Sequence, residues 1–332
     1  MRNVMAGMIF ATLSSAAPLA IAETRDQVPT VYEAGHFFVT PPDGHGGKLR
    51  LLVDSGGSGA RGMFVMYAGA LKRAGWPVRS CHFAGTTAKV TDAPPSVRAM
   101  LPNGTSTPCG ASAFVNEEGS AMVGEDGLIG AGYLPNSTFT FDYPGQKLWR
   151  EASGWKPAKG SRSTPLSIPR TADGLAGGLP LFHLVIDGQT IPMLLDTGAT
   201  AKPSANGKRE TGIETVNGFG VASYVPHRLF EKWHAAHPDW QVVDDGDELI
   251  SHTRLIRVPE VRVAGWSVGP AWFTERSDAN IDFLNDYTTD SVSGSAGANI
   301  FKHFRMTLDY AQGAAWFDCV TGCKAVGESA TP

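Results

Sequence analysis

The sequence predicts a mostly β protein with short helices, built as two related lobes. Of its 332 residues, 39 are Gly and 22 are Pro, and short Val, Leu and Phe runs lie between the turns, a composition typical of β structure. The length favours two cores over one. Residues 51–56 and 193–198 both run from an apolar strand into Asp, a small hydroxyl residue and Gly.

Residues 1–22 have the pattern of a secretory signal peptide. Arg2 precedes a mostly apolar stretch, and Ala20-Ile21-Ala22 fits an A-x-A cleavage site. We therefore expect an exported protein, periplasmic or secreted, whose mature chain begins at Glu23. A retained anchor is the alternative. The stretch is short for a membrane span, so we expect no stable membrane insertion after cleavage.

Four cysteines in an exported chain are most simply two disulfides. Three pairings are open, and the sequence favours Cys81 with Cys109 and Cys319 with Cys323. The spacing does not favour thiolate catalysis or a zinc site, because there is no CxxC motif and no Cys/His cluster.

Other binding functions have weak support in the sequence. The formal net charge is −4 and no basic run stands out, so we expect no nucleic-acid partner. His234 and His237 could form a metal pair on one helical face. A solvated position near a helix C-terminus explains them as well, and we predict no metal site.

An internal repeat links the two halves. The Asp54 and Asp196 motifs are 142 residues apart, so the second half carries about 25 extra residues before the later landmarks of the repeat. Those landmarks are each separated by 167 residues: Gly130 and Gly297, Asp142 and Asp309, Trp149 and Trp316.

The repeat sets the predicted domain boundaries and two predicted helices. We expect lobes at residues 27–150 and 179–318, a Gly- and Pro-rich linker at 151–178, and a disulfide loop and tail at 319–332. A helix is expected over residues 64–74, with Gly75 as its C-cap. A second is expected over residues 226–233, with Pro226 as the first helical residue.

At these landmarks the chain resembles aspartic peptidases of the pepsin and retropepsin kind. Its layout of two lobes in one chain is similar to pepsins, and its motifs are closer to the bacterial retropepsin-like group. The resemblance covers most of both lobes as short motifs: Asp54-Ser55-Gly56, Asp196-Thr197-Gly198-Ala199, Leu128-Ile129-Gly130, Ser295-Ala296-Gly297, Asp142-Tyr143 and Asp309-Tyr310.

The resemblance implies an acid-protease fold with two β-barrel lobes and an interlobe cleft. Asp54 and Asp196 would share one proton and activate a water for attack on a peptide carbonyl. The resemblance also implies a polypeptide substrate, a monomer, and no metal or organic cofactor. Supporting roles in the two loops would fall to Ser55 and Thr197, as hydrogen-bonding residues, and to Gly56 and Gly198, as turn residues.

Two departures from the pepsin pattern keep a second function open. Residue 57 is Gly where pepsins usually carry Ser or Thr. No Tyr lies between Gly75 and Gly127, so the Tyr of a pepsin flap cannot be assigned. The turns at residues 94–95 and 103–104 are candidate flap tips. The alternative is a non-catalytic peptide-binding or inhibitory protein on the same fold.

A minor alternative is a serine esterase. Residues 265–269 match the G-x-S-x-G motif, with Ser267 as the nucleophile. That motif requires a helix directly after Ser, whereas residues 270–273 are expected to be the return strand of a hairpin. His303 is the only His after Ser267.

Overall fold

The computed structural model describes residues 25–57, 59–120, 122–170 and 178–327. The predicted signal peptide therefore lies outside the described residues, as do part of the predicted linker and the last five residues. Among the described residues, no helix is long and apolar enough to cross a membrane.

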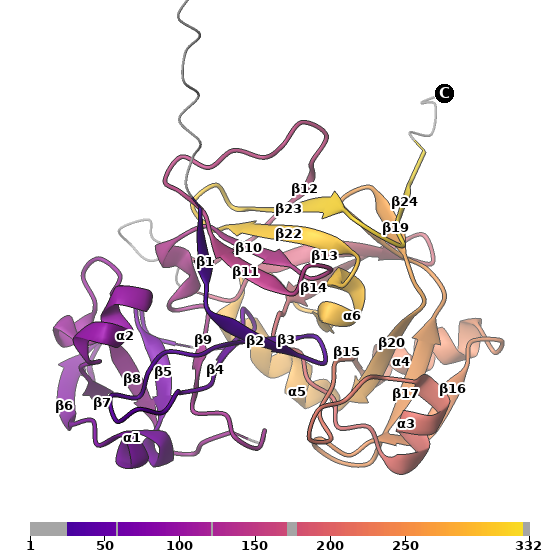
Figure 1. The fold of residues 1–332 in the computed structure, drawn as a ribbon. Coiled ribbons are helices and arrows are strands. Elements are labelled where there is room, and N and C mark those ends of the chain that lie inside the picture. The colour runs from indigo at the N-terminus through magenta and orange to yellow at the C-terminus, as the bar shows by residue number, and fades with distance from the viewer. Residues whose placement is uncertain (1–24, 58, 121, 171–177, 328–332) are drawn as a thin grey trace, which may run out of the picture.

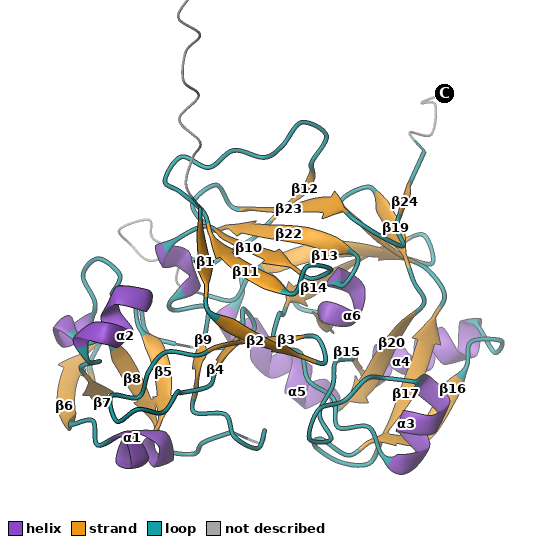
Figure 2. Ribbon diagram, viewed as in Figure 1, coloured by secondary structure: helices purple, strands orange, loops and turns teal. Residues whose placement is uncertain are grey.

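Strands arranged in three sheets dominate the molecule, which confirms the prediction of a mostly β fold (Figure 2). The first sheet belongs to the N-terminal half. Its order from edge to edge is β2 (Thr30–Glu33), β3 (His36–Val39), β4 (Leu51–Val53), β9 (Gly127–Ile129), β5 (Phe64–Tyr67), β8 (Ala113–Asn116), β7 (Thr86–Thr91) and β6 (Val78–Phe83).

The second sheet belongs to the C-terminal half. Its order is β16 (Val242–Asp247), β17 (Thr253–Val258), β20 (Ala271–Arg276), β15 (Ser223–Pro226), β21 (Ser295–Ala296), β14 (Gln189–Leu195), β13 (Leu181–Ile186), β18 (Val261–Val263), β19 (Trp266–Val268) and β24 (Lys324–Ala325).

These two sheets repeat one topology. The order β3-β4-β9-β5-β8-β7-β6 matches β13-β14-β21-β15-β20-β17-β16. The directions match as well, because β4 and β9 are parallel like β14 and β21, and β5 and β8 are parallel like β15 and β20. The repeat found in the sequence therefore corresponds to a repeat of strand order and strand direction.

The third sheet joins the two halves and lies across the top of both lobes in Figure 1. At its centre β10 pairs with β22, so that Thr140 lies opposite Thr307 and their hydroxyls are 2.7 Å apart. Its order is β1 (Asp26–Val28), β11 (Lys147–Arg150), β10 (Phe139–Asp142), β22 (Phe304–Asp309), β23 (Ala314–Cys319) and β12 (Arg162–Pro165).

The segment predicted as a linker contributes a strand to this sheet. Within residues 151–178, Arg162–Pro165 form β12 and pair with β23. In the strand order of the sheet, β12 occupies the place in the second half that β1 occupies in the first. Its position at an edge explains its Ser, Thr and Pro content, because an edge strand needs hydrogen bonds on one side only. The lobe boundaries stay predictions.

Short helices cover the lobe sheets. They are α1 (Ala68–Ala74), α2 (Pro95–Met100), α3 (Ala205–Thr211), α4 (His227–Ala236), α5 (Asp278–Asp282) and α6 (Ala298–Phe301), with 3₁₀ turns η1 (Pro108–Gly110), η2 (Leu134–Asn136) and η3 (Phe283–Tyr287).

Both predicted helices begin later than expected. Residues 64–67 form β5, because this strand pairs with β8 on one side and β9 on the other and its apolar side chains are buried. Helix α1 starts only at Ala68. Gly75 closes α1 at φ 65°, as predicted. Pro226 ends β15 and is the N-cap of α4, so it is not the first helical residue.

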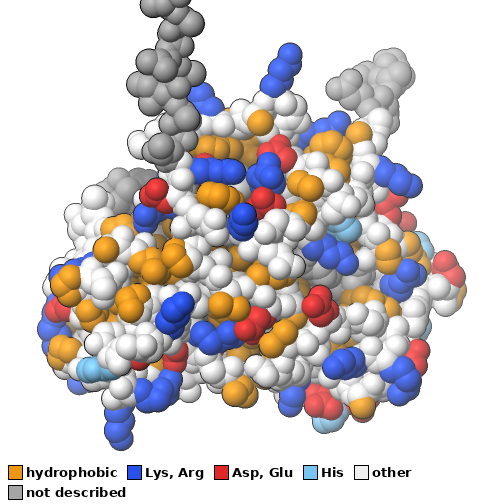
Figure 3. All heavy atoms as spheres, viewed as in Figure 1, with side chains coloured by type: hydrophobic (Ala, Val, Ile, Leu, Met, Phe, Trp, Pro, Cys, Tyr) orange, Lys and Arg blue, Asp and Glu red, His pale blue; other side chains and the backbone are white. Residues whose placement is uncertain are grey.

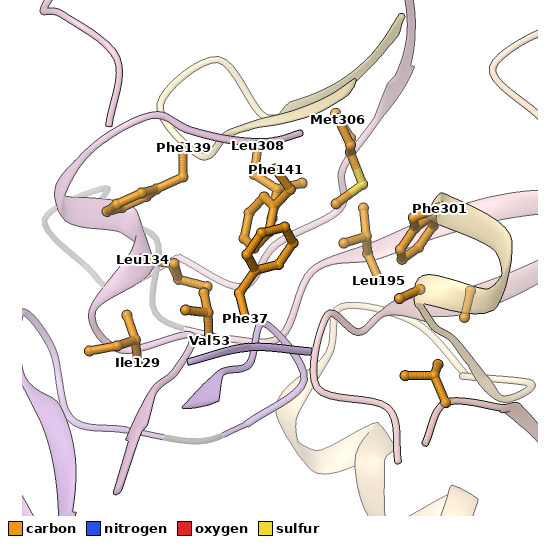
Figure 4. Packing of buried hydrophobic residues seen from close by; sticks show 14 of the residues in the cluster. Phe37, Val53, Ile129, Leu134, Phe139, Phe141, Leu195, Phe301, Met306 and Leu308 are labelled. Carbon is orange, nitrogen blue, oxygen red and sulfur yellow. The ribbon is translucent and has the colours of Figure 1, made fainter. Parts of the chain in front are cut away.

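Buried apolar residues from all three sheets form one large core cluster. Figure 4 shows Val53 and Leu195, which directly precede the two motif aspartates, in the same cluster as Phe37 and Phe141. Both are fully buried. The packing therefore anchors the strands that end at the two aspartates.

The lobe sheets are open, whereas the resemblance implied two β-barrel lobes. The strand order of each sheet runs from one edge strand to another, so the described strands form open sheets and no closed barrel. The cysteines pair as the sequence favoured, Cys81 with Cys109 and Cys319 with Cys323.

The face in Figure 3 carries Lys and Arg interspersed with Asp and Glu.

Candidate active site

Asp54 and Asp196 occupy equivalent positions at the ends of β4 and β14. The Asp54 N–H donates to Ile129 O at 3.0 Å, and the Asp196 N–H donates to Ala296 O at 3.0 Å. Each loop is thus fixed by the short parallel neighbour of its own strand, β9 or β21.

Ser55 and Thr197 hydrogen-bond across the base of the two loops. The Ser55 N–H donates to Thr197 Oγ1 at 3.0 Å, and the Thr197 N–H donates to Ser55 Oγ at 3.0 Å. The two hydroxyls then donate to Leu195 O at 2.7 Å and Val53 O at 2.8 Å, each on the opposite strand. Both residues are buried, so the exchange rigidly joins the loops.

The carboxyl groups face each other over the loop glycines. A Cβ at Gly56 would overlap the Asp196 carboxyl, and a Cβ at Gly198 would overlap the Asp54 carboxyl. Each Gly N–H also donates to the Oδ1 of its own aspartate, at 2.9 Å for Asp54 and 3.0 Å for Asp196. Glycine is needed because any side chain here would separate the carboxyls.

The electrostatics favour one shared proton. Burial raises the pKa of Asp54 well above its usual range, and the negative charge of Asp196 raises it further. A third carboxylate, Glu125, adds to this rise. Two carboxyls placed this closely resist simultaneous ionisation.

Tyr224 and Ser295 both bind Asp196. The sequence did not indicate this role for either residue, although Ser295 belongs to one of the repeated motifs. The Tyr224 hydroxyl donates to Asp196 Oδ2 at 3.0 Å, and Ser295 Oγ donates to the same oxygen at 2.6 Å. Tyr224 lies opposite Ser295 across β15 and β21. Only strand register brings them together, and the one sequence signal was the place of Ser295 two residues before Gly297.

A carboxylate that the sequence did not single out lies on the Asp54 side. The Tyr67 hydroxyl donates to Glu125 Oε1 at 3.1 Å, and Ser120 binds the other Glu125 oxygen. Burial raises the pKa of Glu125. This group is therefore held near Asp54 by side chains of its own lobe.

A cavity of about 240 Å³ opens over the two aspartates, lined on one side by apolar residues of the C-terminal half. Leu249 and Ile250, from the turn between β16 and β17, form part of its wall, and Ile250 is 58% exposed. A larger cavity of about 450 Å³, beside the turn between β2 and β3, contains neither aspartate.

Neither predicted flap tip borders the cavity over the aspartates. Pro94 and Pro95 begin α2, and Asn103 and Gly104 line a separate cavity of about 280 Å³. In the repeated topology, the hairpin β6–β7 corresponds to β16–β17. The β6–β7 hairpin lies at the outer edge of the first sheet in Figure 1. The hairpin that borders the cavity over the aspartates is therefore β16–β17 of the second lobe.

The other candidate residues lie in ordinary structural surroundings. Ser267 is in β19, the return strand of the β18–β19 hairpin, and binds Glu260. Residues 270–273 were expected to be that return strand. Residues 271–273 instead begin β20, which pairs with β15 and β17. His303 contacts Thr321 O, so the described contacts assemble no Ser267–His pair.

His237, one of the two histidines of the candidate metal pair, has other partners. His237 stacks on Trp240 at 4.2 Å and lies 2.9 Å from Asp187. A separate group, His227, Glu231 and Glu275, brings three ligand-type atoms within 4.8 Å of one another. Arg254 already binds both of those carboxylates and offsets part of their negative charge.

No family model matches the sequence, and no curated protein matches it. Among solved structures, the crystal structure of an aspartic proteinase from Irpex lacteus is similar at 12% sequence identity. The match covers 93% of this chain and 100% of that chain with a TM-score of 0.47.

Proposed function

We propose that this chain is an exported aspartic endopeptidase in which Asp54 and Asp196 activate a water. The observation that carries the proposal is the meeting of two Asp-hydroxyl-Gly loops. Ser55 and Thr197 hold the loops together, and each carboxyl rests on the other loop's glycine. Such a pair can hold one proton and present a base and an acid on one side of the cavity.

The chemistry follows from this arrangement. The ionised carboxylate takes a proton from water while the water oxygen bonds to the peptide carbonyl carbon. The protonated carboxyl polarises the carbonyl oxygen and then donates to the leaving nitrogen as the C–N bond breaks. Both carboxyls come from one chain, so a monomer suffices, and no step requires a metal or organic cofactor.

The substrate class follows from the cavity. Leu249, Ile250, Ile281 and Leu284 lie around the aspartates. An apolar wall of this kind favours extended polypeptides with apolar side chains next to the cut.

The test is digestion of a denatured protein mixture by residues 23–332 across a pH series. Cut sites are mapped by mass spectrometry, with and without a transition-state mimic such as pepstatin. Asp54→Asn and Asp196→Asn should each lower kcat by about 10²–10⁴-fold, the usual contribution of general acid–base groups. Asp43→Asn is the control, because Asp43 is an exposed turn residue bound to His45 and Gly47.

Each other outcome contradicts the proposal. Peptide binding without cleavage at any pH would show a non-catalytic binder on this fold. Cleavage that persists in Asp54→Asn but disappears in Ser267→Ala, with labelling by a fluorophosphonate, would show a serine hydrolase.

A further inference from the structure

The two aspartates differ at their outer oxygens. Their Oδ1 atoms have equivalent partners, the N–H groups of Gly56 and Gly198. Asp196 Oδ2 in addition accepts hydrogen bonds from Tyr224 and Ser295. Among the described residues, no hydroxyl group donates to Asp54 Oδ2.

The repeated topology shows which residues stand at the matching places around Asp54. In the second lobe, Tyr224 of β15 lies opposite Ser295 of β21. In the first lobe, the corresponding strands β5 and β9 place Val65 opposite Leu128. The two hydroxyl residues that bind Asp196 are therefore matched, at the equivalent positions of the first lobe, by the apolar residues Val65 and Leu128.

Position 57, directly after the motif, is Gly and so lacks the hydroxyl that the resemblance led us to expect at that position. At Gly57 a Cβ would lie 2.5 Å from Asp54 Oδ2 and 3.2 Å from Leu128 Cδ1. The outer oxygen of Asp54 thus lies against Gly57, with a Leu128 methyl group nearby. An ionised carboxylate is poorly stabilised in such surroundings, whereas a protonated one is tolerated.

Both donors on the Asp196 side are held in place. Ser295 is fully buried in the short strand β21, and Tyr224 is partly buried in β15. The Arg276 guanidinium lies 5.7 Å from the Tyr224 ring centre, and Arg276 is anchored 2.9 Å from the buried Asp247. The hydroxyls are therefore preorganised toward one oxygen of one carboxyl.

On these grounds, and resting on the proposed function, we infer that Tyr224 and Ser295 are positioning residues that keep the negative charge on Asp196 and leave the shared proton on Asp54. Asp196 would then be the base that takes the proton from water, and Asp54 the acid that donates to the substrate. Hydrogen bonds from two hydroxyls to one oxygen stabilise its ionised form.

Other charged groups around the pair agree with this order. On the Asp54 side, the negative Glu125 from the loop before β9 opposes ionisation of Asp54, and Tyr67 of β5 holds Glu125 in place. On the Asp196 side, the cation of Arg276 of β20 lines the same cavity. The phenols of Tyr143 and Tyr310 are buried and stay neutral, since burial raises the pKa of each well above its usual range.

The first arm of the test is the pH profile of kcat/KM for wild type, Tyr224→Phe, Ser295→Ala and the double variant. Loss of either donor should move the acidic limb upward by about one pH unit, a tenfold change in the ionisation equilibrium. The double variant should move it further. Tyr133→Phe is the control, because Tyr133 donates to Pro102 O away from the aspartates, and its limb should not move.

The second arm does not depend on activity. Aspartate labelled with ¹³C at the carboxyl carbon is followed by NMR, and the Asp54 signal is identified by its loss in Asp54→Asn. We expect the Asp54 carboxyl in wild type to stay protonated to a pH above the usual range of an aspartate. In the Tyr224→Phe/Ser295→Ala double variant the Asp54 signal should titrate at lower pH, because the proton then moves partly to Asp196.

The two arms separate the inference from the proposed function. If wild type cleaves peptides but Asp54 titrates in the usual range of an aspartate, or the acidic limb stays in place in the double variant, the inference is wrong and the peptidase proposal stands. If wild type cleaves nothing but Asp54 keeps its proton in the NMR titration, the proton assignment holds and the peptidase proposal is wrong.

Discussion

Residues 54–56 and 196–198 have matching backbones and unequal surroundings. The motif predicted the carboxyls, and the resemblance based on it implied the hydrogen-bonding roles of Ser55 and Thr197 and the turn roles of the glycines, because each role lies within three consecutive residues. Tyr224, Ser295 and Glu125 could not be found in this way. They reach the aspartates from other strands and loops, and only folding fixes their distances.

A stability measurement tests the burial of Asp54. Burial and the negative charge of Asp196 raise the folded-state pKa of Asp54. The protonated Asp54 carboxyl therefore contributes fully to stability below the unfolded pKa of about 3.9. This contribution is lost as the pH rises through the folded-state pKa. Asp54→Asn should therefore raise the melting temperature at pH 7 relative to wild type. The difference should shrink toward pH 3.5 in thermal melts.

Asp43→Asn provides a comparison of opposite sign. Hydrogen bonds from the His45 and Gly47 N–H groups lower the pKa of Asp43. Its stabilising contribution is present above the unfolded pKa and is lost as pH falls through the folded pKa. Its replacement should lower the melting temperature at pH 7 only. Equal shifts for both variants would contradict the burial of Asp54.

At the scale of elements, local sequence predicted the helices less well than the strands around the motifs. The run 64–74 is apolar enough for a helix, yet its first four residues form β5, because the sheet offers hydrogen bonds on both sides. The two candidate flap turns, at residues 94–95 and 103–104, do not line the cavity over the aspartates. The tip that borders the cavity lies in the second lobe, at the turn between β16 and β17.

Ile250, at that turn, should contribute to substrate binding. It is 58% exposed and lines the cavity over the aspartates, so an apolar substrate side chain can cover it. Ile250→Ser should raise KM for apolar peptides by about tenfold, a typical effect of losing one buried aliphatic contact, with kcat and melting temperature nearly unchanged.

Val320→Ser is the matched control for Ile250→Ser. Val320 is 50% exposed and follows β23, outside the cavity over the aspartates. Its KM should equal that of wild type. A fall in kcat without a change in KM for Ile250→Ser would place this turn in the chemistry rather than in binding.

For the whole molecule, the central sheet is what places one lobe against the other. The strand order β1-β11-β10 continues into β22-β23-β12, and the 167-residue repeat makes Thr140 and Thr307 equivalent across the seam. The two aspartates meet because this seam, the hydroxyl exchange at the loop bases and the shared core all join the same two halves.

Replacing one seam threonine should destabilise the whole protein. Thr140→Val leaves the buried Thr307 hydroxyl without its partner, at a cost of about 1–3 kcal/mol. The melting temperature should fall by about 2–4 °C for each kcal/mol, in a single calorimetric transition. The double variant Thr140→Val/Thr307→Val should recover most of this loss, and an additive loss would contradict the pairing.

The sequence alone determined the mostly β class, the repeat and the two aspartate loops, and it favoured the disulfide pairing that the structure shows. These features depend on neighbouring residues or on a fixed spacing along the chain. Only the tertiary structure decided that β12 completes the central sheet and that the second lobe borders the cavity. It alone also showed that hydroxyls surround Asp196 while Gly57 and Leu128 flank Asp54. The physical reason is register: pairing between strands distant in sequence sets which side chains meet, and a shift of one residue would turn each to the opposite face.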